Sequence, residues 1–115
     1  MSSYNNDILK EYRGDTIDFE LKFPYNITGH TFTVGFKVSL DDQNSKLKLQ
    51  VTSDSGDHPD DDPINGVKYI RIPSNLTRKL TPNVYYYGIQ KLIEPDIVKT
   101  IIVGKIEILP DVNQN

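Results

Sequence analysis

Apolar and polar residues alternate in several separate segments of this 115-residue chain. Successive side chains of a β-strand point to opposite faces, so a period of two indicates a strand with one buried face and one solvent face. Other segments are enriched in β-branched and aromatic residues, which favour strands. The predicted strands are residues 16–23, 31–40, 46–51, 67–72, 84–92 and 98–109.

The residues between these strands predict how they connect. The short, polar separation of 31–40 from 46–51 favours a hairpin. Residues 74–80 are too few for a regular helix and predict one helical turn or a crossing connection. Gly104 interrupts the last strand, which indicates either a bulge or a close approach of another backbone segment. The first fifteen residues leave room for a seventh strand.

These features predict one all-β domain over residues 1–115. Short strands without an amphipathic helix favour an immunoglobulin-like antiparallel β-sandwich of about six to seven strands. We expect a core spanning about 12–110, an acidic loop at 53–63 and short polar termini. The segment 82–87 places a tyrosine near the start of a late strand. It could therefore form a tyrosine corner, in which a tyrosine hydroxyl bonds a nearby backbone carbonyl.

Charge and composition exclude several classes of protein. The chain has no cysteine, which rules out disulfides and thiolate chemistry. Its longest purely aliphatic run, 101–103, is far shorter than the ~20 residues of a membrane span. The N-terminus has neither the basic nor the apolar part of a signal peptide, so we expect synthesis in the cytoplasm and no membrane partner. The formal charge of −3 gives no reason to expect nucleic-acid binding, since 46–48 provides only a local basic strip.

The sequence offers little catalytic chemistry. His30 and His58 are the only histidines, and we expect both to be exposed in loops. Asp18 and Glu20 lie at i and i+2 on one strand face, as a pair of catalytic carboxylates could. A solvent-facing strand surface explains them more simply. We therefore predict no enzyme activity and no cofactor.

The loop at 53–63 holds five of the sixteen acidic residues, two prolines and no aliphatic residue. This composition predicts an exposed loop. Its carboxylates are the oxygen ligands that Ca²⁺ prefers, but their spacing does not match an EF-hand. A solvated loop is the favoured interpretation, with a weak calcium site as the alternative. The candidate ligands are Asp54, Asp57, Asp60, Asp61 and Asp62.

Three consecutive tyrosines, Tyr85, Tyr86 and Tyr87, are candidate interface residues, because aromatic side chains are enriched at protein interfaces. Neighbouring side chains of a strand point to opposite faces. Tyr85 and Tyr87 therefore share one face, and Tyr86 lies on the other. One of these faces should belong to the core, so core packing is the alternative for each tyrosine.

Short motifs in a fixed order resemble a known family. The chain reads RGDT at 13–16, ITGHTF at 27–32, LTPNVYYY at 80–87 and KTIIVGKIEI at 99–108. This series is similar to the immunoglobulin-like structural domain of tailed-bacteriophage proteins, such as the N-terminal domain of upper baseplate proteins. The resemblance covers about 12–112. Asn83 departs from it where glycine is usual, and 53–63 resembles an insertion.

The resemblance implies a non-enzymatic virion structural or assembly protein, located in a baseplate, tail or neck. Such a protein would act through contacts with other virion proteins, in a symmetric oligomer within the particle. The resemblance implies no catalytic residues. The alternative is a stand-alone binding module that recognises a host glycan or a host protein.

Overall fold

The computed structural model describes residues 3–39, 41, 45–53, 56, 58–94 and 97–111, with side chains for all of these except 3–7, 93 and 94. The described residues form seven strands, one short α-helix and one 3-10 helix. In chain order the elements are β1 (Ser3–Tyr12), β2 (Ile17–Lys22), β3 (Thr31–Lys37), β4 (Leu47–Thr52), η1 (Pro63–Asn65), β5 (Val67–Ile72), α1 (Ser74–Thr77), β6 (Asn83–Glu94) and β7 (Ile97–Leu109).

All six predicted strands are confirmed, with ends shifted by a few residues, and β1 is the seventh. The predicted hairpin is confirmed as the antiparallel pair β3–β4. The expected helical turn is α1. Residues 42–44, in the turn of that hairpin, lie outside the described residues.

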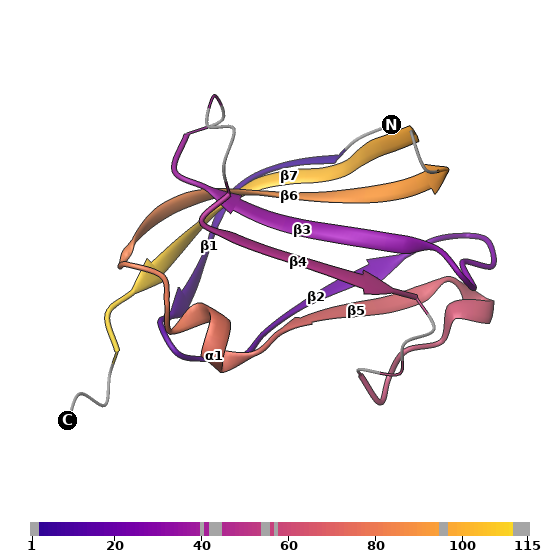
Figure 1. The fold of residues 1–115 in the computed structure, drawn as a ribbon, viewed down its shortest axis with the longest axis horizontal. Coiled ribbons are helices and arrows are strands. Elements are labelled where there is room, and N and C mark those ends of the chain that lie inside the picture. Colours follow the sequence, from indigo (N-terminus) through magenta and orange to yellow (C-terminus); the bar gives the residue numbers. More distant parts are fainter. Residues whose placement is uncertain are drawn as a thin grey trace.

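The strands form two packed sheets, which confirms the all-β sandwich (Figure 1). One sheet has the order β1-β7-β6-β3-β4, and the other consists of β2 and β5. The expectation of a wholly antiparallel sandwich is wrong at one pair, because β1 runs parallel to β7. The alternation of residues in the N-terminal segment does not indicate which strand this segment will pair with, or whether the pair will be parallel or antiparallel.

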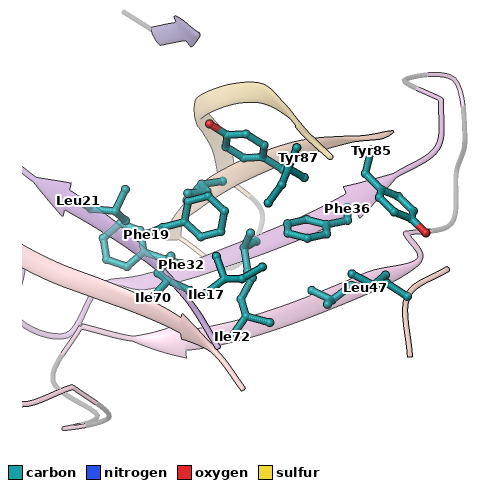
Figure 2. Close-up of a cluster of buried hydrophobic side chains, with 14 of the residues drawn as sticks. Ile17, Phe19, Leu21, Phe32, Phe36, Leu47, Ile70, Ile72, Tyr85 and Tyr87 are labelled. Carbon is teal, nitrogen blue, oxygen red and sulfur yellow. The ribbon is translucent and has the colours of Figure 1, made fainter. Parts of the chain in front are cut away.

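Side chains from both sheets interdigitate between the layers (Figure 2). The ring of Phe19 on β2 lies 5.1 Å from the ring of Tyr87 and 6.5 Å from that of Phe36, centroid to centroid. These contacts join the two sheets through the period-two face that the sequence predicts. The buried apolar residues of the strands are Ile17, Phe19, Leu21, Phe32, Val34, Phe36, Leu47, Ile70, Ile72, Tyr85, Tyr87, Ile89, Ile106 and Ile108.

The crossing from β5 to β6 contains a tyrosine corner. The hydroxyl of Tyr85 donates a hydrogen bond to the backbone carbonyl of Thr81, four residues upstream, at 2.6 Å. Nearby, the hydroxyl of Thr77 in α1 donates to the backbone carbonyl of Asp15 at 2.7 Å. These two bonds fix the crossing to the start of β6 and to the turn before β2.

Gly104 makes room for a core side chain. It pairs in regular register with Tyr87, so the predicted alternative of a bulge at this glycine is wrong. The β6–β7 register shifts instead between Ile89 and Gln90. A Cβ atom on Gly104 would lie 2.7 Å from ring atoms of Tyr87. The glycine is therefore needed because an aromatic ring, and not the predicted backbone segment, approaches it closely.

The acidic loop is less exposed than its composition predicts. His58 is 8% exposed, and the side chain of Asp61 is 6% exposed. Asp61 forms a 2.7 Å ion pair with the fully buried Lys68 and accepts the backbone N–H of Tyr69 at 2.8 Å. The loop thus folds back onto β5, because a lysine on the core face of that strand needs a carboxylate partner.

A matched pair of glycine variants tests the role of Gly104. We expect Gly104→Ala to lower the free energy of unfolding by about 1–3 kcal/mol, because the new methyl group overlaps the ring of Tyr87. Gly88→Ala meets nothing closer than the Ile102 carbonyl oxygen at 3.9 Å. That variant should raise stability by about 0.5–1 kcal/mol, since alanine orders at a lower entropic cost. Urea unfolding measures both changes, and equal effects would contradict this interpretation.

Candidate binding surface

The outer face of the five-stranded sheet contains a hollow above two paired glycines. Gly35 of β3 lies opposite Gly88 of β6. Lys48 of β4 and Val103 of β7 continue this row on either side. Because neither glycine has a side chain, the centre of the row lies lower than its ends. The resulting pocket has a volume of about 280 Å³.

Two neighbouring rows of side chains form the walls of this hollow. Lys37 and Tyr86 lie opposite each other on one side, and Tyr86 is in turn paired with Lys105. The Lys105 ammonium lies 5.4 Å from the centroid of the Tyr86 ring, in a cation–π contact. On the other side, Thr33 and Gln90 are paired and provide hydrogen-bonding groups. The remaining lining residues are Ser45, Tyr87 and Thr100.

The charged groups of the hollow are basic. Lys37 and Lys48 line it, and no ion-pair partner is seen for either among the described residues. Lys46 is exposed and directly precedes β4. The part of the sheet around the hollow is therefore positively charged, although the chain as a whole carries a formal charge of −3.

The three predicted interface tyrosines divide between the core and this surface. Tyr85 and Tyr87 are only 3% and 4% exposed, so their proposed role as interface residues is wrong. Tyr85 forms the tyrosine corner, and Tyr87 fills the space above Gly104. Tyr86 points to the outer face and forms a wall of the hollow. It is the candidate that the fold leaves available for contact.

The carboxylates of β2 belong to a separate polar cluster. Asp18 accepts two hydrogen bonds from Arg71, at 2.9 and 3.1 Å. The Arg71 hydrogen bond lowers the pKa of Asp18, and the nearby His58 adds to this effect. Glu20 accepts a hydrogen bond from the hydroxyl of Tyr69, which raises the pKa of Tyr69 to about 12. Both carboxylates thus have partners within the fold.

His58 is part of this cluster, so the expectation of an exposed loop histidine is wrong. Its ring stacks on Tyr69 at 4.4 Å. Its Nδ1 accepts the backbone N–H of Asp60 at 3.0 Å, which in the neutral ring leaves the proton on Nε2. Nε2 lies 3.3 Å from Asp18. The histidine therefore ties the acidic loop to the two-stranded sheet. His30 is partly buried beside the ring of Tyr25.

The calcium candidates do not converge in the described part of the loop. Asp54 and Asp57 lie outside the described residues. Asp61 is paired with Lys68, and Asp62 accepts a hydrogen bond from the side chain of Asn65. The side chain of Asp60 is 71% exposed. Within the described ranges, no three acidic or histidine side chains are grouped so that they could hold a metal ion.

The comparisons with known proteins add no assignment. No protein-family model matches this sequence, and no curated protein is significantly similar to it. Among the described helices, none is both long and apolar enough to cross a membrane.

The pH dependence of stability tests the Asp18–Arg71 pair. Because folding lowers the pKa of Asp18, the pair's contribution is fully present above the ordinary value of 3.8 and is lost as pH falls through the lower folded value. We expect wild type to lose more stability than Asp18→Asn between about pH 5 and about pH 2. Chemical unfolding along this range measures the difference.

Asp41→Asn provides the control for this measurement. Asp41 is exposed, and no ion pair is seen for it among the described residues. This variant should therefore follow the wild-type acid profile. Parallel profiles for wild type and Asp18→Asn would show that the ion pair contributes nothing to acid sensitivity.

Proposed function

We propose that this chain is a non-enzymatic structural or assembly protein of a bacteriophage virion, acting in a baseplate, tail or neck through protein–protein contacts. The order of the short motifs across about 12–112 supports the phage assignment, through their resemblance to the immunoglobulin-like domains of tail proteins. The exposed edge of the larger sheet supports the assembly role. The working partners are further copies of this chain or other virion proteins.

The observation that carries the proposal is the edge strand β1. It is ten residues long and lies at the end of the five-stranded sheet, paired only with β7. Its outward residues include Ile8 and Tyr12, which are 46% and 44% exposed. A long edge strand with exposed apolar side chains readily pairs with another chain. β1 therefore provides both open backbone groups and apolar contact area.

The other edges of the sandwich are less suited to pairing. The edge at β4 has six residues and presents Lys48, Gln50 and Thr52 to solvent. The edge at β2 carries charged outward side chains. The open side of β5 is bridged by backbone hydrogen bonds between Asp62 and Val67, at 2.9 and 3.0 Å. Charged side chains and covering loops are the usual protection of sheet edges.

Light scattering over a range of protein concentrations tests this proposal. We expect wild type to form one defined oligomer of closed symmetry. The variant Ile8→Lys/Tyr12→Lys should be monomeric, because two charges on the edge disfavour strand pairing. Circular dichroism checks that the variant remains folded.

The matched control places the same charges on the opposite edge, as Gln50→Lys/Thr52→Lys. This variant should assemble like wild type. A wild-type protein that stays monomeric at the highest concentration would overturn self-assembly through β1. Loss of the oligomer in both double variants would show that added charge, rather than the edge, is responsible.

A further inference from the structure

We propose that the hollow above Gly35 and Gly88 is a binding site for an anionic saccharide, a sugar ring that carries a carboxylate or a phosphate. The proposal rests on the outer face of β3 and β6 and is independent of the β1 edge.

Neither backbone conformation nor packing requires a glycine at position 88. Its φ is not positive, and a Cβ atom there would make one ordinary contact, 3.9 Å from the Ile102 carbonyl oxygen. Glycine in the middle of a strand weakens it and often marks a position that a ligand approaches closely. In contrast, Gly35 has a packing role, because its Cβ would lie 3.0 Å from the hydroxyl oxygen of Ser45. Gly88 is thus the residue whose main effect is to keep the hollow open.

The walls of the hollow combine an aromatic ring with hydrogen-bonding side chains. Tyr86 presents an aromatic ring, whose apolar body can pack against the C–H groups of a sugar. Thr33, Gln90 and Thr100 provide hydroxyl and amide groups that can exchange hydrogen bonds with sugar hydroxyls. A few convergent polar groups beside an aromatic side chain are typical of small-molecule sites.

The charge of the hollow favours an anionic ligand. Lys37 of β3 lies in one wall of the hollow and Lys48 of β4 lies at the end of its glycine row, with no ion-pair partner seen for either among the described residues. Lys105 adds a third ammonium beside Tyr86. Lysine ammonium groups form charge-assisted hydrogen bonds with carboxylates and phosphates. An acidic sugar would give Lys37 and Lys48 an anionic partner, which no carboxylate of the described residues provides, so the site favours an acidic sugar over a neutral one.

The size and position of the hollow restrict the kind of ligand. At about 280 Å³ the pocket lies near the lower limit of ligand sites, which suits one sugar ring rather than a large cofactor. It lies over β3 and β6, each of which already has a strand on both sides. An extended peptide could not pair its backbone there. These features favour a saccharide over an acidic peptide.

Isothermal titration calorimetry with defined probes tests the proposal. The acidic probes are an oligosaccharide of alternating glucuronic acid and N-acetylglucosamine, and glucose 1-phosphate. The neutral probe is an oligomer of N-acetylglucosamine. We expect at least one acidic probe to bind, with an affinity at least about tenfold above that of the neutral one. Binding should weaken as salt concentration rises.

Three variants locate the site. Gly88→Val fills the hollow with a residue that favours strands, and we expect it to remove binding while the protein stays folded. Lys37→Gln/Lys48→Gln should weaken binding of the acidic probe by about tenfold or more and reduce its salt dependence. Lys79→Gln removes an exposed lysine that does not line the hollow, so it should bind like wild type. If Gly88→Val does not fold, the affinity of Lys37→Gln/Lys48→Gln for the acidic probe still tests the site.

Several results would overturn the proposal. The first is that neither acidic probe binds. The second is that Gly88→Val or the lysine variant binds the acidic probe as tightly as wild type. The third is that polyglutamate or an oligonucleotide binds as tightly as the acidic saccharide. Equal binding of those polymers would indicate an unspecific anion-binding surface or an acidic protein partner. The Ile8→Lys/Tyr12→Lys variant should retain saccharide binding. Failure of β1-mediated assembly and failure of the saccharide site are therefore separate outcomes.

Discussion

Packing between Phe19, Phe36 and Tyr87 is the interaction on which the rest of the structure depends. The smaller sheet has only the two strands β2 and β5, and an isolated strand pair is marginally stable in water. Its stability must come from apolar side chains that pack onto the larger sheet. Tyr87 contributes to this contact from β6, and its ring leaves no room for a side chain at Gly104. The same residue therefore packs the two sheets together and restricts position 104 to glycine.

Most of the fold could be predicted because it follows from local alternation. In 17–21 and 32–36, every second residue is apolar, and those residues form the core face of β2 and β3. The apolar Val38, in the same predicted strand, lies beyond β3 and is exposed. The parallel pairing of β1 could not be predicted, because it depends on contacts made late in the chain. The burial of His58 was also missed. It arises from a tertiary partner, Asp18, forty residues away, to which loop composition gives no clue.

The hollow shows a different limit of sequence reasoning. Gly35 and Gly88 occupy outward positions of their strands, where the alternating pattern predicts only that the residue is not apolar. That they form a hollow depends on the strand register, which places them opposite each other. The available signal was glycine in the interior of two strands, which is unusual without a conformational reason. The register also gathers Lys37 and Lys48 around one position of an otherwise acidic protein.

The parallel pairing of β1 with β7 has a mechanical consequence. The two strands run in the same direction, so β1 begins at one end of the pair and β7 finishes at the other (Figure 1). A pulling force applied through the two ends of the chain would slide one strand along the other. It would load all the hydrogen bonds between them at once instead of opening them one at a time. Tension along the two strands therefore acts on the β1–β7 pair as a shear load.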